Sequence, residues 1–272
     1  MRDRASTRSR DRLAPAVALA AALLGTAMPA AAGAVLDRVR SGGTLRVCIW
    51  PDYYGITYRN PRNQQLSGID IDLSAELGRD LKVRVEHVDS SFPMLVADLS
   101  AGKCDVAMFA VGQLPQRMEH LKFTRPYLQS DIYGVTTKGN RVVTKWADID
   151  APGVQVAVQS GTFMEPVMAA ALKQATLVVV RPPATREAEL EAGRVDVFMT
   201  DFPYSRRLLD NADWATLVAP PRPFHVLPYA YAVKPGDDDW LATVDAFVQR
   251  IQRDGRLETA ARRHGLSQIV VR

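Results

Sequence analysis

A strand–helix–strand rhythm that occurs twice along the chain is the feature that most constrains its fold. In the first half, strand-like runs alternate with amphipathic stretches, over residues 45–50, 69–81, 82–88, 92–102 and 104–111. Apolar residues at helical spacing, such as Ile69, Leu73 and Leu77, indicate that the amphipathic stretches are helices. Crossovers of this kind predict an α/β fold with a mostly parallel sheet flanked by helices.

The second half repeats this order, over residues 154–159, 162–174, 175–180, 184–193 and 194–200. Each half also contains a Gly-basic-X-Asp signature, Gly102 to Asp105 in the first and Gly193 to Asp196 in the second. A glycine that stops a helix just before a strand explains both copies, so the signature indicates architecture rather than chemistry.

Two further strand-like segments, residues 130–139 and 228–236, join the halves. We interpret the first as a strand that leaves the first half and the second as a strand that returns to it, which together make a short hinge. A helical tail over 238–265 would pack back on the first half. The predicted fold therefore has two lobes, with lobe 1 formed by 44–133 plus 229–272 and lobe 2 by 134–228.

The first 32 residues have the pattern of a secretory signal peptide. An arginine-rich start precedes an apolar run that begins near Leu13 and ends in small residues at Ala30 to Ala32. Pro15 and Pro29 interrupt this run, so a retained membrane anchor is the weaker interpretation. We expect a soluble protein in the periplasm.

The formal net charge of +4 suggests a basic protein, but most of it lies in the first 32 residues. They hold five arginines and two aspartates, so the remaining 240 residues carry only +1. A chain this close to neutrality lacks the basic footprint of a nucleic-acid partner, and we expect none. A monomer is expected.

The two cysteines, Cys48 and Cys104, both lie in apolar, strand-like contexts. An oxidising compartment permits one disulfide between them. Two buried thiols are slightly favoured, because nothing in the sequence sets the distance between the two residues.

The sequence offers little for catalysis. The four histidines are scattered without metal-ligand spacing, and no Gly-X-Ser-X-Gly elbow, phosphate-binding glycine loop or reactive cysteine motif occurs. We therefore expect no metal, no cofactor and no enzymatic activity.

Polar and aromatic residues do follow the predicted strands, where ligands bind in open α/β sheets. These segments are Trp50 to Tyr54, Ala110 to Arg117, Gln159 to Phe163, and Thr200 with Asp201. Five segments around them, 43–60, 66–81, 102–127, 156–163 and 193–205, resemble the bacterial periplasmic solute-binding proteins of family 3. The resemblance runs in consistent order over nearly all of the chain after residue 32, and it implies the type II periplasmic-binding-protein fold and a polar amino-acid binder of an ABC transporter.

The resemblance implies roles for two charged residues. Arg117 matches the arginine that grips the ligand α-carboxylate, which suits a planar guanidinium. Asp201 matches the aspartate that accepts the ligand ammonium from the opposite lobe. An arginine on a solvated turn and an aspartate that caps the helix at Phe202 are the structural alternatives.

It also implies that Ser160 and Thr162 belong to a turn that presents backbone N–H groups to the ligand carboxylate, although a helix cap explains them equally. Tyr53 and Phe92 match aromatic residues that sandwich the ligand side chain, and either could be core instead.

The chain departs from the polar-ligand pattern at Trp50, Ala110, Gly112 and Phe163. Trp50 and Gly112 are expected to line the site. These residues remove hydrogen-bonding groups and add apolar surface, which disfavours a cationic ligand side chain and favours an aromatic, aliphatic or larger ligand.

We therefore expect a solute-binding protein that closes around an amino-acid-like carboxylate and delivers it to an ABC permease in the inner membrane. One alternative is a periplasmic dehydratase on the same fold, for which Glu165 is the candidate general acid. Another is a freestanding sensor that presents its ligand to a receptor, since no output domain follows in the sequence.

Overall fold

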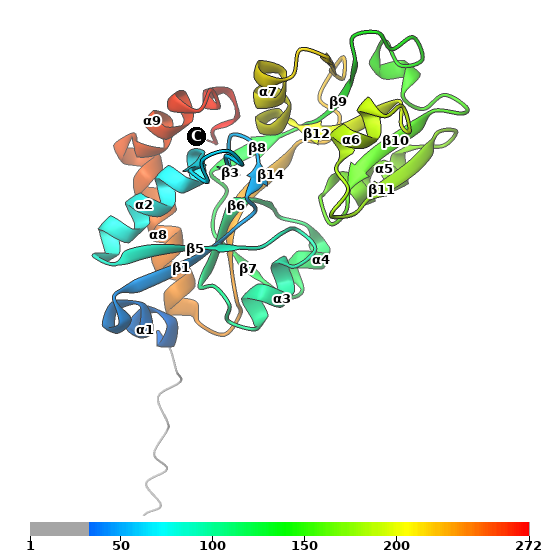
Figure 1. The fold of residues 1–272 in the computed structure, drawn as a ribbon. Helices are drawn as coiled ribbons and strands as arrows, with labels where there is room; N and C mark the ends of the chain where they lie inside the picture. The colour runs from blue at the N-terminus through cyan, green and yellow to red at the C-terminus, as the bar shows by residue number, and fades with distance from the viewer. Residues whose placement is uncertain (1–32, 272) are drawn as a thin grey trace, which may run out of the picture. The chain divides into compact units, whose positions relative to one another are not determined.

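The computed structural model describes residues 33–271 (Figure 1). The predicted signal peptide, 1–32, lies outside the described residues. The first sheet has the order β5-β1-β6-β14-β7, with β8 paired to β14. Its strands are β1 (Thr44–Ile49), β5 (Arg84–Asp89), β6 (Val106–Gly112), β7 (Lys122–Phe123), β8 (Leu128–Ser130) and β14 (Leu227–Val233).

Helices cover both faces of this sheet. They are α1 (Ala34–Gly42), α2 (Ile69–Leu81), α3 (Leu95–Ser100), α4 (Pro115–Met118), α8 (Asp238–Asp254) and α9 (Arg256–Arg263), followed by the 3₁₀ turn η2 (Ser267–Ile269). Figure 1 shows α2, α8 and α9 on one side and α3 on the other. The crossovers from β1 to β5 through α2 and from β5 to β6 through α3 run in opposite directions across the sheet, so right-handed connections place α2 and α3 on opposite faces. The tail helix buries one apolar stripe, Trp240, Val244, Phe247, Val248 and Ile251, as its periodicity predicts.

The second sheet has the order β11-β10-β12-β9-β13. Its strands are β9 (Ile132–Thr137), β10 (Gln155–Gln159), β11 (Thr176–Val180), β12 (Val197–Asp201) and β13 (Ala215–Val218). The accompanying helices are α5 (Met164–Ala171), α6 (Arg186–Glu191), α7 (Phe202–Asn211) and the 3₁₀ turn η1 (Trp146–Asp148). The two halves of the described chain thus share one arrangement of three parallel strands and two crossover helices.

The sheets are mixed, and here the structure differs from the expectation of mostly parallel sheets. β5, β1 and β6 are parallel, but β14 is antiparallel to β6, β7 and β8. In the second sheet β9 is antiparallel to both β12 and β13. Two of these antiparallel strands, β9 and β14, come from the segments that join the halves.

The segments that join the two sheets are hydrogen-bonded to each other. Ser130, at the end of β8, lies opposite Leu227 at the start of β14. The lobe bounds drawn from the sequence and the use of these segments as a hinge stay predictions.

A third, three-stranded sheet was not predicted. It consists of β2 (Asp52–Tyr53), β3 (Thr57–Arg59) and β4 (Leu66–Ser67). Strands of two or three residues carry no readable alternation, but this small sheet fixes the backbone at Tyr53 by pairing it with Thr57.

The repeated Gly-basic-X-Asp signature has one structural role in both halves. Asp105 Oδ2 accepts a hydrogen bond from the backbone N–H of Arg46 in β1 at 2.8 Å. Asp196 Oδ2 accepts the equivalent bond from Gln155 in β10 at 2.8 Å. Each aspartate therefore ties the start of the strand that follows a crossover helix to the start of its neighbour, which confirms an architectural origin.

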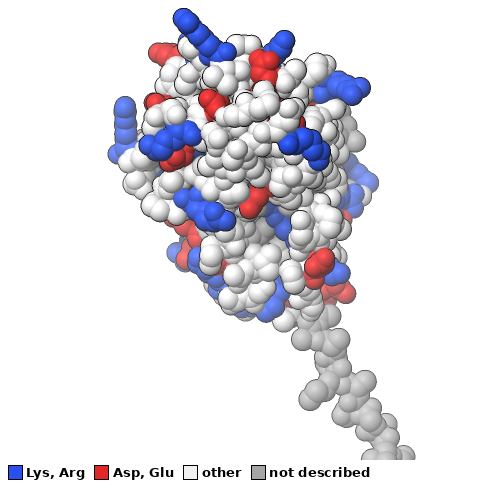
Figure 2. All heavy atoms as spheres, turned by 90° about the vertical axis from the view of Figure 1, so that its right-hand side faces the viewer, with Lys and Arg blue, Asp and Glu red and all other residues white. Residues whose placement is uncertain are grey.

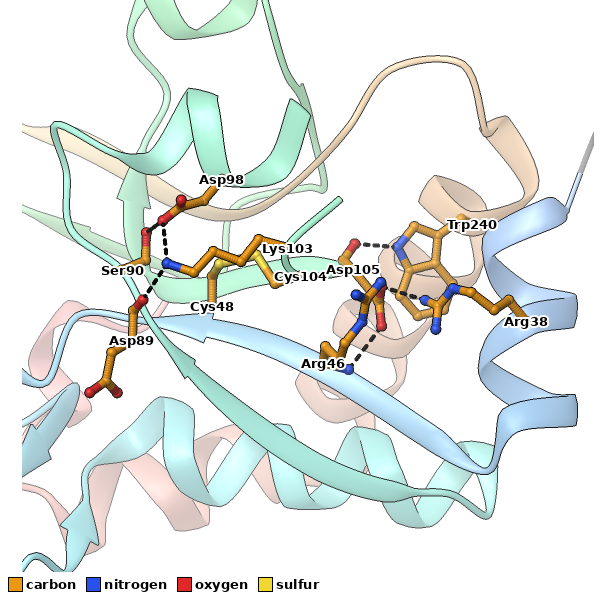
Figure 3. Close-up of a disulfide and its surroundings, with 10 residues drawn as sticks. All are labelled: Arg38, Arg46, Cys48, Asp89, Ser90, Asp98, Lys103, Cys104, Asp105 and Trp240. Carbon is orange, nitrogen blue, oxygen red and sulfur yellow. Dashed lines mark hydrogen bonds and ion pairs between the residues drawn. A yellow bond between two sulfur atoms is a disulfide. The ribbon is translucent and has the colours of Figure 1, made fainter. Parts of the chain in front are cut away.

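Cys48 and Cys104 form a disulfide, so the slightly favoured interpretation as two buried thiols was wrong (Figure 3). Cys48 lies in β1 and Cys104 comes just before β6, the strand beside it, which brings the two Cα atoms to 5.5 Å. The neighbouring Asp105 forms ion pairs with Arg38 and Arg46, and its carbonyl accepts from Trp240 Nε1 at 2.8 Å. This corner therefore holds α1, β1, β6 and α8 together.

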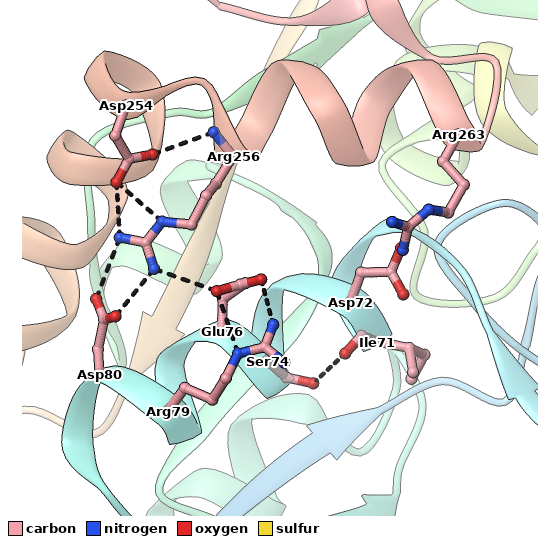
Figure 4. Close-up of polar contacts among 9 residues, drawn as sticks. All are labelled: Ile71, Asp72, Ser74, Glu76, Arg79, Asp80, Asp254, Arg256 and Arg263. Atoms are coloured by element: carbon pink, nitrogen blue, oxygen red, sulfur yellow. Dashed lines mark hydrogen bonds and ion pairs between the residues drawn. The ribbon is translucent and has the colours of Figure 1, made fainter.

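Ion pairs join α2 to α9 on the surface (Figure 4). Arg256 contacts Asp80 at 2.9 Å and Asp254 at 2.8 Å, and Arg263 contacts Asp72 at 2.8 Å. Because exposed pairs contribute only about 0–1 kcal/mol each, they orient the tail more than they stabilise it.

Asp237 links two helix starts and allows a test of this corner. Its Oδ1 caps α8 by accepting from Trp240 N at 2.8 Å, and its Oδ2 accepts from Val35 N in α1 at 2.7 Å. We expect Asp237→Ala to lower the free energy of unfolding by about 1–2 kcal/mol, measured by urea unfolding. Asp237→Asn keeps one acceptor oxygen and should lose less, and an unchanged midpoint for the alanine variant would contradict this role.

The surface on the side shown in Figure 2 carries basic and acidic residues interspersed among uncharged ones, without a continuous basic patch on that face. Within residues 33–271, no helix is long and apolar enough to cross a membrane. The same residues hold no cluster of three or more His, Cys, Asp or Glu side chains that could bind a metal ion.

Candidate functional site

A small cavity lies at the ends of the strands of both sheets, where the connecting turns meet. Its volume is about 20 Å³, which is room for about one water molecule. It is lined by Trp50, Tyr53, Phe92, Ala110, Gly112, Arg117, Thr162, Phe163, Met164, Arg186, Thr200, Asp201 and Tyr204. An amino-acid-sized ligand would therefore have to separate these side chains.

The structure brings seven of the eight predicted ligand-binding residues to this cavity, namely Trp50, Tyr53, Phe92, Gly112, Arg117, Thr162 and Asp201. Ser160, the eighth, is buried nearby but does not line it. Their roles in binding stay predictions.

Arg117 is a buried cation that has no carboxylate partner among the described residues. Only 7% of it is exposed. Its Nη1 donates to Gly112 O at 2.9 Å, its Nη2 donates to Gly161 O at 2.7 Å, and its guanidinium carbon lies 5.0 Å from the centre of the Phe92 ring. Burial lowers the pKa of Arg117 to about 10. A guanidinium desolvated in this way favours an anion that would replace its bonds to neutral carbonyl groups.

Two glycines allow close packing next to Arg117. A Cβ at Gly112 would lie 2.4 Å from Leu227 Cδ2, and a Cβ at Gly161 would lie 2.8 Å from the backbone nitrogen of Pro93. Gly161 also has a φ of 74°. Glycine therefore allows the turn after β10 to approach the segment after β5 closely enough for Arg117 to reach the carbonyl of Gly161.

Asp201 ends β12 and caps α7, so the capping alternative is present in the structure. Its Oδ1 accepts from Tyr204 N at 3.1 Å, and its Oδ2 accepts from the hydroxyl groups of Tyr53 and of Tyr229, the latter at 2.7 Å. Burial raises the pKa of Asp201, although the tyrosine hydrogen bonds and nearby Arg186 oppose that shift. Three of about four acceptor positions on the carboxylate are thus already used.

Trp50, Tyr53 and Phe92 form an aromatic wall. Ring centroids lie 5.2 Å apart for Trp50 and Tyr53, 5.3 Å for Trp50 and Phe92, and 5.9 Å for Tyr53 and Phe92. Phe92 also packs on Phe109 of the core at 5.2 Å. The wall thus packs on the core of the first half and also lines the cavity, and its contact with a ligand stays a prediction.

The turn after β10 satisfies its polar groups locally. Thr162 Oγ1 donates to Gln159 O at 2.7 Å, and Glu165 Oε2 accepts from Gly161 N at 2.7 Å. Glu165 does not line the cavity. The carboxylate considered for a dehydratase therefore binds the backbone of the turn before α5 in this structure.

Asp70 supports the cavity from behind. It is fully buried and accepts hydrogen bonds from Ala110 N at 2.9 Å, Tyr127 Oη at 2.5 Å and Tyr231 Oη at 3.0 Å. Ala110 has a φ of 49°, and the bond to Asp70 holds this disfavoured conformation at the cavity wall. Burial raises the pKa of Asp70 to about 7.

Arg186, Met164 and Tyr204 line the cavity but were not predicted from the sequence. Arg186 begins α6 after the N-cap residue Thr185. A cation in the first turn of a helix interacts unfavourably with the helix dipole. This position was the only signal in the sequence that Arg186 has a role outside the helix itself.

The fold and this site define a protein of the type II periplasmic-binding class. Residues 45–267 match the bacterial extracellular solute-binding proteins, family 3, and the chain belongs to that family. One relative is a cyclohexadienyl dehydratase of Pseudomonas aeruginosa, 28% identical over 237 residues that cover 87% of this chain and 88% of that protein. Another is the L-cystine-binding protein TcyJ of Escherichia coli K12, 25% identical over 224 residues that cover 82% and 83%.

Solved structures agree. The crystal structure of an ancestral amino acid-binding protein, described as a precursor of cyclohexadienyl dehydratase, has a TM-score of 0.76 and 28% identity and covers 84% of this chain and 98% of its own. A substrate-binding protein of an amino acid ABC transporter from Streptococcus pneumoniae, bound to L-arginine, has a TM-score of 0.76 at 22% identity, covers 86% and 99%, and supports the fold.

Proposed function

We propose that this protein is the solute-binding component of an ABC uptake system and holds a small carboxylate in the cavity between its two sheets. The observation that carries the proposal is Arg117, a buried guanidinium whose hydrogen-bond acceptors among residues 33–271 are carbonyl oxygens alone. A ligand carboxylate would give it a bidentate, charge-assisted partner. The protein would act in the periplasm, deliver its ligand to a membrane permease and catalyse nothing.

Closure about the segments that join the two sheets would be the mechanism. Tyr53 and Arg117 belong to the first half, and each donates a hydrogen bond to a residue of the second half, Asp201 or Gly161. A ligand that takes over these contacts would stabilise the arrangement in which the halves meet.

A thermal-shift screen against amino acids, amines and small carboxylates tests the proposal. A carboxylate at 100 times its dissociation constant should add about 2.7 kcal/mol and raise the melting temperature by about 5–10 °C. Amines without a carboxylate should cause no shift. The proposal would be contradicted if only amines raised the melting temperature. It would also be contradicted if no compound with a carboxylate raised it.

A dehydratase is the second candidate, favoured by the 28% identity to the Pseudomonas aeruginosa enzyme. The general acid would then be Asp201 rather than Glu165, because Asp201 lines the cavity and burial raises its pKa. Incubation with a prephenate-like cyclohexadienyl carboxylate separates the two functions. An aromatic product that disappears in Asp201→Asn would indicate the enzyme, whereas a binding protein returns the compound unchanged.

A further inference from the structure

Arg186 is a second buried cation in the same cavity. It is 3% exposed, and its guanidinium carbon lies 4.7 Å from the centre of the Tyr204 ring and 5.2 Å from that of Phe198. Its Nη1 donates to Met199 O at 2.7 Å. Its Nε is buried without a hydrogen-bond partner in the described part of the chain, and no carboxylate there comes within ion-pair distance of it.

The charges that line the cavity do not balance. They are Arg117, Arg186 and Asp201. Asp201 is close enough to Arg186 for the cation to lower its pKa, but the hydrogen bonds of Asp201 come from Tyr53, Tyr229 and the backbone of Tyr204. A zwitterionic ligand adds no net charge and would leave one buried cation uncompensated, which is costly in a desolvated site.

We infer that the ligand is a compact dianion, with one carboxylate on Arg117 and a second anionic group on Arg186. The inference rests on the proposed function and narrows its ligand class. The aromatic wall of Trp50, Tyr53 and Phe92 favours an apolar body between the two anionic groups. A cationic side chain would bring a third positive charge to the cavity.

Matched pairs of ligands test the inference by isothermal titration. The probes are phenylsuccinate against 3-phenylpropionate, and L-glutamate against L-glutamine, with L-arginine as a cationic control. The wild-type protein should bind the better diacid about 10- to 100-fold more tightly than its matched monoacid, the range expected for one charge-assisted contact. L-Arginine should show the weakest binding.

Variants assign that preference to Arg186. Arg186→Gln should reduce the ratio of diacid to monoacid affinity to near one. Arg186→Lys, which keeps the charge, should retain part of the preference. Arg117→Gln should weaken both members of a pair.

The outcomes separate this inference from the proposed function. Monoacids could bind the wild-type protein as tightly as diacids and lose binding in Arg117→Gln. That result would overturn the inference of a dianionic ligand and would still support the proposed carboxylate site at Arg117. An unchanged ratio in a folded Arg186→Gln protein would overturn it as well. Failure of every carboxylate to bind would overturn both the dianion inference and the proposed function. The wild-type ratio needs no variant, so the test stands even if Arg186→Gln does not fold.

Discussion

Replacing Arg117 with alanine should weaken the binding of a carboxylate ligand by about 2–5 kcal/mol, about thirtyfold or more. In the intact protein Arg117 is 7% exposed and lies at the cavity with two carbonyl partners. Without the guanidinium, the ligand carboxylate would be buried with no cation at that position. Its uncompensated desolvation would destabilise the complex.

Isothermal titration with the best carboxylate of the thermal screen measures this loss. Arg125→Ala is the matched control, because Arg125 forms an exposed ion pair with Asp245 at 2.7 Å and does not line the cavity. That control should bind like the wild-type protein. Urea unfolding without ligand checks that Arg117→Ala is folded. Wild-type affinity in a folded Arg117→Ala protein would contradict the carboxylate role.

Loss of the Cys48–Cys104 disulfide should lower the free energy of unfolding by about 4 kcal/mol, the chain-entropy value for a loop of this length. The cysteines are 56 residues apart in sequence, and the loop between them contains β2 to β5, α2 and α3. Without the cross-link, the unfolded chain gains the freedom of that whole loop.

Urea unfolding of the oxidised protein, the reduced protein and Cys48→Ala/Cys104→Ala measures the effect. The reduced protein keeps both sulfur atoms, so it separates the cross-link from the volume lost in the alanine variant. Reductant should leave the double variant unchanged. A reduced protein as stable as the oxidised one would show that the bond is absent in solution or adds nothing to stability.

Periodic patterns predicted most of the fold because they reflect burial directly. Ile69, Leu73 and Leu77 recur at helical spacing, and all three are fully buried in α2. The β2–β4 sheet was missed because its strands are too short to show a pattern. The disulfide was missed because the distance between Cys48 and Cys104 depends on which strands are neighbours, a tertiary fact.

Some residues of the candidate site could likewise be predicted from the sequence, and others could not. Arg117 and Asp201 could be named because they match motifs that follow particular strands, and both line the cavity. Arg186 could not, because residues distant in sequence create its environment. The ring of Tyr204 and the carbonyl of Met199 bury it, and both follow it by more than ten residues. In the sequence alone it is one basic residue among the charged residues of a surface helix.

The departures at Trp50, Gly112 and Phe163 matter for the ligand, because all three line the cavity. They supply apolar surface where the resemblance implies polar groups. With Arg186 they point away from cationic amino acids and toward an anionic ligand with an apolar body.

A crystal structure of the protein with the strongest carboxylate from the thermal screen tests the central claim most directly. We expect the carboxylate within hydrogen-bond distance, about 2.7–2.9 Å, of the Arg117 guanidinium, where Gly161 O is bonded in the present structure. A ligand bound elsewhere, with the Arg117 bond to Gly161 intact, would contradict it.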